Sequence, residues 1–217
     1  MFVHKGVYFS LLQMLDGETT GEMPIELAIS RDGLDWRRPF RRELFLDVTH
    51  RRDQFDGGAI WSNATPIVLG DEIRFYYGAY SGLWKGELIR KPTGIGLATM
   101  PLDRFAGVRP IDKIGQITLK PLNLPSFTRG ITLNADATNG KILVEVLDKD
   151  GYRLKGVVKG ASSPIYTKEM SIPIQGDSLR HQARWKHANM SFGLLPPGEY
   201  LLRLHLENAT VYAIDIK

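Results

Sequence analysis

Carboxylate side chains beside turn residues are the groups in this sequence best suited to bind a ligand. Asp32 follows Arg31, and Asp56 stands directly before two glycines. A carboxylate accepts hydrogen bonds from sugar hydroxyls, and glycine lets a ligand approach the backbone closely. A tight β-turn is the favoured interpretation of the segment with Arg31 and Asp32, and for Asp56 a β-turn followed by a buried Trp61 is an equal alternative. If a sugar site is present, Arg31, Asp32 and Asp56 are candidates for it.

Aromatic side chains cluster in the segment 76–80 and at Trp84. Sugar rings present apolar C–H faces that stack on aromatic rings. Tyr76 and Tyr77 point to opposite faces of a strand, so only one of them can face a given cleft. We add Tyr77 and Trp84 to the candidate substrate-binding residues. Positions in a hydrophobic core remain the alternative for both.

Six arginines fall within sixteen residues, and such a run raises the question of a phosphate or nucleic-acid partner. The same segment contains Glu43, Asp47 and Asp53, and the formal net charge of the chain is only +4. No nucleic-acid motif accompanies the run. We therefore favour a solvated, partly salt-bridged loop, and a site for nucleic acid or another polyanion is the less favoured alternative. The arginines are Arg37, Arg38, Arg41, Arg42, Arg51 and Arg52.

Several classes of site are not expected. The chain has no cysteine and five histidines, none of them at the spacing of a metal-ligand pair. No phosphate-binding loop or nucleophile elbow is present, so we expect no metal and no cofactor. No apolar run approaches the roughly 18 residues of a membrane span, so we expect no membrane partner. No leader peptide is visible, and the compartment stays open.

Short apolar or alternating runs separated by Gly, Pro, Asn and Asp must position these candidates. Runs of this length with such turns are typical of an all-β sandwich, barrel or propeller. Helical pattern is limited to a single turn near 101–105. The segments 69–71, 138–140, 148–151 and 196–198 are predicted turns. The predicted strands are Gly6–Leu12, Ile25–Ile29, Thr65–Leu69, Glu72–Tyr77, Gly94–Ala98, Ile131–Leu133, Lys141–Leu147, Glu199–Leu206 and Thr210–Ile216.

The character of the sequence changes near Pro110. The part before it is rich in Trp, Tyr, Phe and Arg, and the part after it has cleaner alternating strands. Gly107, Pro110 and Gly115 cluster at the change, as in a linker. We therefore predict two domains, residues 1–109 and 110–217.

Several stretches of the sequence, taken in order, resemble a known family of proteins. The first part resembles the late blades of five-bladed β-propeller glycosidases related to glycoside hydrolase families 32 and 43, in the stretches His4–Phe9, Leu27–Trp36, Phe75–Gly78 and Gly94–Ala98. The second part resembles the β-sandwich appended to members of that group, in Gly115–Leu122, Leu133–Asp136, Gly140–Asp148, Gly176–Ser178, Trp185 and Ala209–Ala213.

The resemblance implies an incomplete propeller of about two blades followed by a β-sandwich. It also implies a carbohydrate-active protein of glycosidase ancestry. In such glycosidases the nucleophilic Asp comes from the first blade. This chain has no Trp-x-Asn-Asp-Pro segment, and Arg31-Asp32-Gly33 resembles the blade turn. We expect a fragment that lacks the nucleophile blade, and we assign no catalytic residue. Whether hydrolysis survives is open, and a non-catalytic carbohydrate-binding or structural β module is the alternative.

An incomplete propeller would leave an open sheet edge and an uncovered apolar face. We expect the chain to cover them by self-association or strand exchange, or by contact with its own sandwich. The partners expected from the sequence are therefore a carbohydrate ligand and a second copy of the chain.

Overall fold

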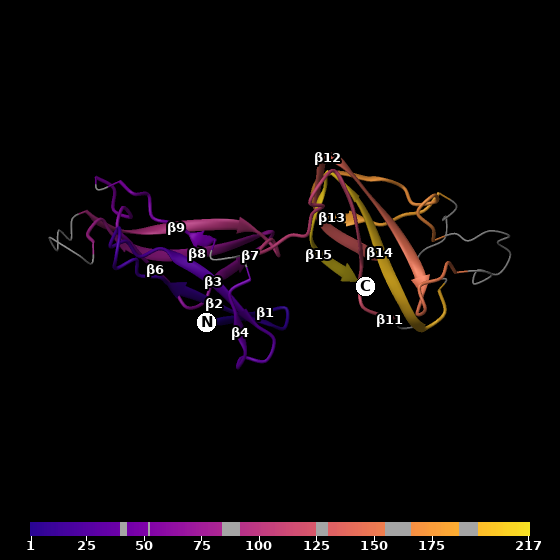
Figure 1. The fold of residues 1–217 in the computed structure, drawn as a ribbon, viewed down its shortest axis with the longest axis horizontal. Helices are drawn as coiled ribbons and strands as arrows, with labels where there is room; N and C mark the ends of the chain where they lie inside the picture. The colour runs from indigo at the N-terminus through magenta and orange to yellow at the C-terminus, as the bar shows by residue number, and fades with distance from the viewer. Residues whose placement is uncertain (40–42, 52, 84–91, 125–129, 155–165, 187–194) are drawn as a thin grey trace. The chain divides into compact units, whose positions relative to one another are not determined.

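The structure is a computed structural model that describes residues 1–39, 43–51, 53–83, 92–124, 130–154, 166–186 and 195–217. Within these ranges the chain is all-β, as predicted, with fifteen strands and no helix. The described residues accordingly include no helix able to cross a membrane. The chain divides into two compact units, Met1–Leu102 and Asp103–Lys217 (Figure 1).

The first sheet of the N-terminal unit is antiparallel and begins at the N-terminus. A two-residue turn links its first two strands, with φ of 45° at Lys5 and 74° at Gly6, as the twist of a tight hairpin requires. The strand order is β1-β2-β3, and β4 and β5 both pair with β3. The strands are β1 (Phe2–His4), β2 (Val7–Gln13), β3 (Ile25–Ser30), β4 (Trp36–Arg37) and β5 (Leu44–Leu46).

The second sheet of this unit is built around one central strand. This central strand, β8, pairs with β9 along its whole length and with β6 and β7 on its other side. The predicted turn at 69–71 is confirmed, and Gly70 has a φ of 59° there. The strands are β6 (Ala59–Ser62), β7 (Ile67–Leu69), β8 (Glu72–Tyr80) and β9 (Thr93–Pro101).

The two sheets of the N-terminal unit pack through aromatic and branched side chains. Phe75 of β8 contacts Phe45 edge-on, with ring centroids 5.2 Å apart, and Phe2 with centroids 6.4 Å apart. Ile25 and Ile60 share a smaller cluster and are fully buried. Burial of each such side chain stabilises the fold by roughly 1.5–3 kcal/mol.

The C-terminal unit contains one six-stranded antiparallel sheet of order β10-β14-β12-β13, with β11 pairing β14 and β15 pairing β12. The long strand β12 pairs first with β15 and then with β14, so these two strands form one interrupted partner for it. The strands are β10 (Ile114–Thr118), β11 (Leu122–Leu124), β12 (Ile131–Asp148), β13 (Ile174–Gln182), β14 (Gly198–Glu207) and β15 (Thr210–Ile216).

The core of the C-terminal unit lies against one face of this sheet. Leu133, Val144 and Leu204 are at most 1% exposed and lie in one cluster with Trp185. The indole N–H of Trp185 donates to the carbonyl of Val144 at 3.0 Å. Tyr166 packs edge-on against Trp185, with ring centroids 5.1 Å apart. The buried indole thus satisfies its only donor while filling the core.

Each of the nine predicted runs overlaps a strand, with Ile131–Leu133 and Lys141–Leu147 both lying in β12, but three local expectations are wrong. The predicted turn at 138–140 lies inside β12, which continues through it. The predicted helical turn near 101–105 is absent, because Pro101 ends β9 and Asp103 has a φ of 62°, outside the helical region. Trp61 is 38% exposed instead of buried, because it lies on the outer face of β6.

Candidate functional site

Asp56 is a buried carboxylate whose two oxygens both accept hydrogen bonds. Asp56 is only 8% exposed. The Thr49 hydroxyl donates to Oδ1 at 3.0 Å, and the Tyr77 hydroxyl donates to Oδ2 at 3.0 Å. The backbone N–H of Thr49 also donates to the Asp56 carbonyl at 3.0 Å. The carboxylate is held in one orientation with two hydroxyls beside it.

The β8–β9 pair positions Tyr77. Its ring lies over Gly96 of β9, where an added Cβ would approach the ring to 2.2 Å. The Phe55 ring stacks on the Tyr77 ring, with centroids 6.1 Å apart and an interplanar angle of 14°. Burial, helped by the hydrogen bond to Asp56, raises the pKa of Tyr77 to about 12. Tyr77 therefore remains a protonated donor at neutral pH.

A second buried carboxylate, Glu22, lies in a chain of three polar side chains. His50 Nδ1 is 2.9 Å from Glu22 Oε2, and His50 Nε2 is 3.3 Å from Asp47 Oδ2. Glu22 is only 7% exposed. His50 has a φ of 58°, a left-handed conformation that is uncommon for a residue with a side chain. The backbone thus holds the imidazole between two carboxylates.

The two groups lie at the same end of the N-terminal unit. Thr49 and His50, which bind the two buried carboxylates, are consecutive, with Cα atoms about 3.8 Å apart. Met23, next to Glu22, accepts and donates backbone hydrogen bonds with Ile60 and Gly58 at 3.1 and 2.9 Å. We call this set the carboxylate cluster; its members are Glu22, Asp47, Thr49, His50, Asp56 and Tyr77.

Asp32 belongs to a turn after β3. Its Oδ1 accepts hydrogen bonds from the Ser30 hydroxyl and from the backbone N–H groups of Leu34 and Asp35, at 2.8–2.9 Å. These bonds, chiefly from the Asp35 and Leu34 amides, lower the pKa of Asp32. Arg31 lies beside it on a depression of about 350 Å³. The geometry is that of the turn interpretation.

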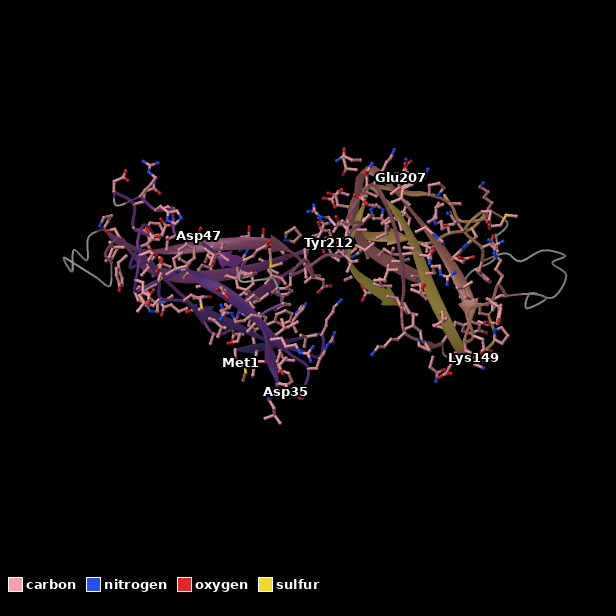
Figure 2. All side chains as sticks on the ribbon, viewed as in Figure 1. Met1, Asp35, Asp47, Lys149, Glu207 and Tyr212 are labelled. Atoms are coloured by element: carbon pink, nitrogen blue, oxygen red, sulfur yellow. The ribbon has the colours of Figure 1, made fainter. Side chains whose placement is uncertain are left out.

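The turn and the carboxylate cluster lie at opposite ends of β3. Thr49 follows Val48, which packs with Ile25 at the start of the strand, and Asp32 follows its end. Six strand residues span roughly 17–20 Å. Figure 2 shows Asp35 of the turn and Asp47 of the cluster far apart within the N-terminal unit.

The five candidate residues therefore do not form one site. The structure brings together Asp56 and Tyr77, and it places Arg31 and Asp32 elsewhere. Trp84 lies outside the described residues. Sequence reasoning missed Glu22, Thr49 and His50, because nothing local connects residues 28 positions apart.

The arginine-rich segment is partly paired. Arg38 binds Glu26 through Nε and Nη2, both at 2.7 Å, and Arg51 Nη2 is 3.1 Å from Asp53. Arg41, Arg42 and Arg52 lie outside the described residues. In the part of the chain that is described, no group of acids and histidines has the arrangement of a metal site. The described arginines fit the expected salt-bridged surface.

No protein-family model, curated protein or solved structure matches this chain.

His50 makes the stability of the N-terminal unit pH-dependent. Its hydrogen bond to Glu22 raises its pKa above 6.5 despite the opposing effect of burial. A raised folded-state pKa contributes stability below the unfolded pKa, and this stability is lost as the pH rises through the folded pKa. We expect the melting temperature to fall as the pH increases above about 6.5.

The measurement is an NMR titration of the His50 ring with melting curves at each pH. The His50→Gln variant should lose the part of the pH dependence that this residue supplies. A His50 pKa at or below the 6.5 of a free histidine would contradict the expectation.

Proposed function

We propose that the chain is a carbohydrate-active protein of glycosidase ancestry that binds sugar at the carboxylate cluster. In this proposal the N-terminal unit is part of a β-propeller and the C-terminal unit is a β-sandwich. Two antiparallel sheets packed face to face, as neighbouring propeller blades are, support the first assignment. The resemblance to glycoside hydrolase families 32 and 43 supports the same assignment.

The observation that carries the proposal is the pair of buried carboxylates at one end of the N-terminal unit. Glu22 is 7% exposed and Asp56 is 8% exposed, and both carboxylates bind polar side chains. Oriented carboxylates with hydroxyl and imidazole neighbours suit sugar hydroxyls, which both donate and accept hydrogen bonds.

The geometry around Asp56 favours binding over hydrolysis. A glycosidase needs one carboxyl group as nucleophile or base and a second as acid. Both oxygens of Asp56 already accept hydrogen bonds from Thr49 and Tyr77, which stabilise its charge and reduce its nucleophilicity. His50, held between Glu22 and Asp47, is the member of the cluster that can exchange protons near neutral pH. We therefore propose binding with weak or no turnover.

A non-catalytic binding role for the C-terminal unit is the second candidate. An open depression of about 800 Å³ lies on this unit and presents carboxylate, amide, hydroxyl and guanidinium groups. Asp136, Asn139, Asn208, Thr210 and Arg109 contribute them. Groups of both signs and both hydrogen-bonding types suit a neutral polyol better than a highly charged ligand.

The proposal is tested with the full chain and a panel of neutral oligosaccharides, by titration calorimetry and by hydrolysis of chromogenic glycosides. We expect binding to one sugar class and little turnover. The Asp56→Asn and Tyr77→Phe variants should each weaken binding at least about tenfold, the equivalent of roughly 1.4 kcal/mol.

Arg31→Ala is the matched control, because it changes a charged residue at the other end of the unit. It should leave the affinity unchanged within about twofold. Binding that survives both cluster variants but is lost in Asn139→Ala would transfer the site to the C-terminal depression. Absence of binding across the panel would refute the carbohydrate proposal.

A further inference from the structure

The second sheet of the N-terminal unit has one buried face and one exposed apolar face. Directly opposed residues of antiparallel strands lie on the same face. Ile73 and Phe75 of β8 point into the core and are at most 3% exposed. The alternate residues of β8, at positions 72, 74, 76, 78 and 80, therefore point to the opposite, outer side of the sheet. The large apolar residues that point outward form a surface that we call the outer face. They are Trp61, Ile67, Leu69, Tyr76, Ile95 and Leu97.

The outer face is at the upper end of the size range of apolar patches on single chains. Its six side chains are 37–82% exposed. With roughly 200 Å² for each large side chain, they expose on the order of 600 Å². The largest apolar patch on a typical monomer is about 300–600 Å². A standard protein interface takes about 800 Å² from each partner, so this patch with its polar margin is of the right size for a stable dimer.

The shape of the outer face is complementary to itself. Gly78 lies in the middle strand, opposite Trp61 on one side and Ile95 on the other. A Cβ added at Gly78 would meet no atom within 4 Å, so open space lies above it. Ile95 is 82% exposed and stands as a ridge beside this trough. A two-fold axis between trough and ridge would place each Ile95 over the Gly78 of the other copy.

The charges on this side of the sheet do not oppose such contact. Glu72 and Arg74 are the charged residues that the described strands place there, and they form an ion pair at 2.6 Å. The face therefore presents no net charge that would repel an identical face or select a partner of opposite charge. Sheets packed face to face lie about 10 Å apart, which suits aliphatic and aromatic side chains.

We propose that the outer face binds a second copy of this chain in a two-fold symmetric dimer, with Ile95 of each copy seated over Gly78 of the other. The proposal does not depend on sugar binding, because the carboxylate cluster includes no residue of the outer face.

The first test is sedimentation equilibrium of the full chain at concentrations from about 1 to 100 μM. We expect a dimer. The Ile95→Arg variant should raise the dissociation constant at least about a hundredfold, because a charged side chain would be buried without a partner. Since Ile95 is a surface residue in the monomer, the variant should keep its melting temperature within a few degrees. Leu34→Arg, at a residue 84% exposed on the turn after β3, is the matched control and should remain dimeric.

The second test examines the register. The natural chain has no cysteine, so a mixture of the Ile95→Cys and Gly78→Cys variants should form a mixed disulfide on mild oxidation. A mixture of Ile95→Cys and Leu34→Cys variants should not. A monomer at all concentrations, or a dimer that Ile95→Arg leaves intact, would overturn the proposal. Loss of sugar binding without loss of the dimer would bear only on the proposed function.

Discussion

Replacing Gly140 by alanine is expected to destabilise the C-terminal unit by about 3 kcal/mol. A Cβ at this position would lie 1.8 Å from the carbonyl oxygen of Glu207 and 2.7 Å from its carbonyl carbon. These are backbone atoms of β14, so no side-chain rotation can relieve the clash. The end of β14 would have to move away from β12, which would weaken the ladder that both strands share.

Hydrogen exchange of the β12 and β14 amides, with urea unfolding, measures this effect. Gly130→Ala is the matched control, because an added Cβ there meets no atom within 4 Å and the φ is not positive. Alanine at 130 should be neutral or stabilising by a few tenths of a kcal/mol through the unfolded chain. Equal effects of the two substitutions would contradict the clash at Gly140.

The same region shows where prediction from sequence fails. Thr138, Asn139 and Gly140 have the composition of a hairpin turn, so the sequence predicts two strands, Ile131–Leu133 and Lys141–Leu147, where the structure has the single strand β12. In the structure, the β12 residues that belong to the hydrophobic core cluster are odd-numbered before this point (131, 133, 135 and 137) and even-numbered after it (142, 144 and 146). This change of parity is that of a bulge, where the pairing register with β13 and β14–β15 also shifts.

A turn and a bulge differ in what pairs with the second half of the strand. Local residue types favour chain reversal in both cases. Here β14 and β15, more than fifty positions away, pair with the two halves of the same strand β12. The pairing decides between the two outcomes, and it is set by residues remote in sequence.

The candidate site also depends on contacts between residues that are remote in sequence. Asp56 and Tyr77 are chemically suitable residues that composition alone can single out. Their hydrogen bond depends on the β8–β9 pair, which places Tyr77 over Gly96, and on the loop that brings Thr49 to Asp56. Arg31 and Asp32 are chemically suitable as well, but short-range hydrogen bonds keep Asp32 in its turn. The sequence shows which residues are chemically suitable, whereas the packing of the sheets determines which of them lie close together.

Glu145 is the residue for which a single change of charge should most affect the C-terminal unit. It lies on β12 and is only 4% exposed. His205 Nε2 is 3.2 Å from Oε2, Arg153 Nε is 3.4 Å from Oε1, and Arg203 Nη1 is 3.8 Å from Oε2. Arg203 is its direct cross-strand neighbour on β14. One buried carboxylate therefore holds three basic side chains on the sheet.

We expect Glu145→Ala to reduce the free energy of unfolding by about 3 kcal/mol, because removal of one partner leaves the partly buried bases without their counter-charge. Glu145→Gln keeps the size and part of the hydrogen bonding, so the loss should be about 1–2 kcal/mol. Glu169→Gln is the matched control. Glu169 binds the same Arg153 at 2.8 Å, but its side chain is 59% exposed, so its removal should cost less than about 1 kcal/mol. If urea unfolding gave equal losses for Glu145→Gln and Glu169→Gln, the charge of Glu145 would be worth no more than that of a surface ion pair, and packing of the β12–β14 ladder would account for the stability of this face.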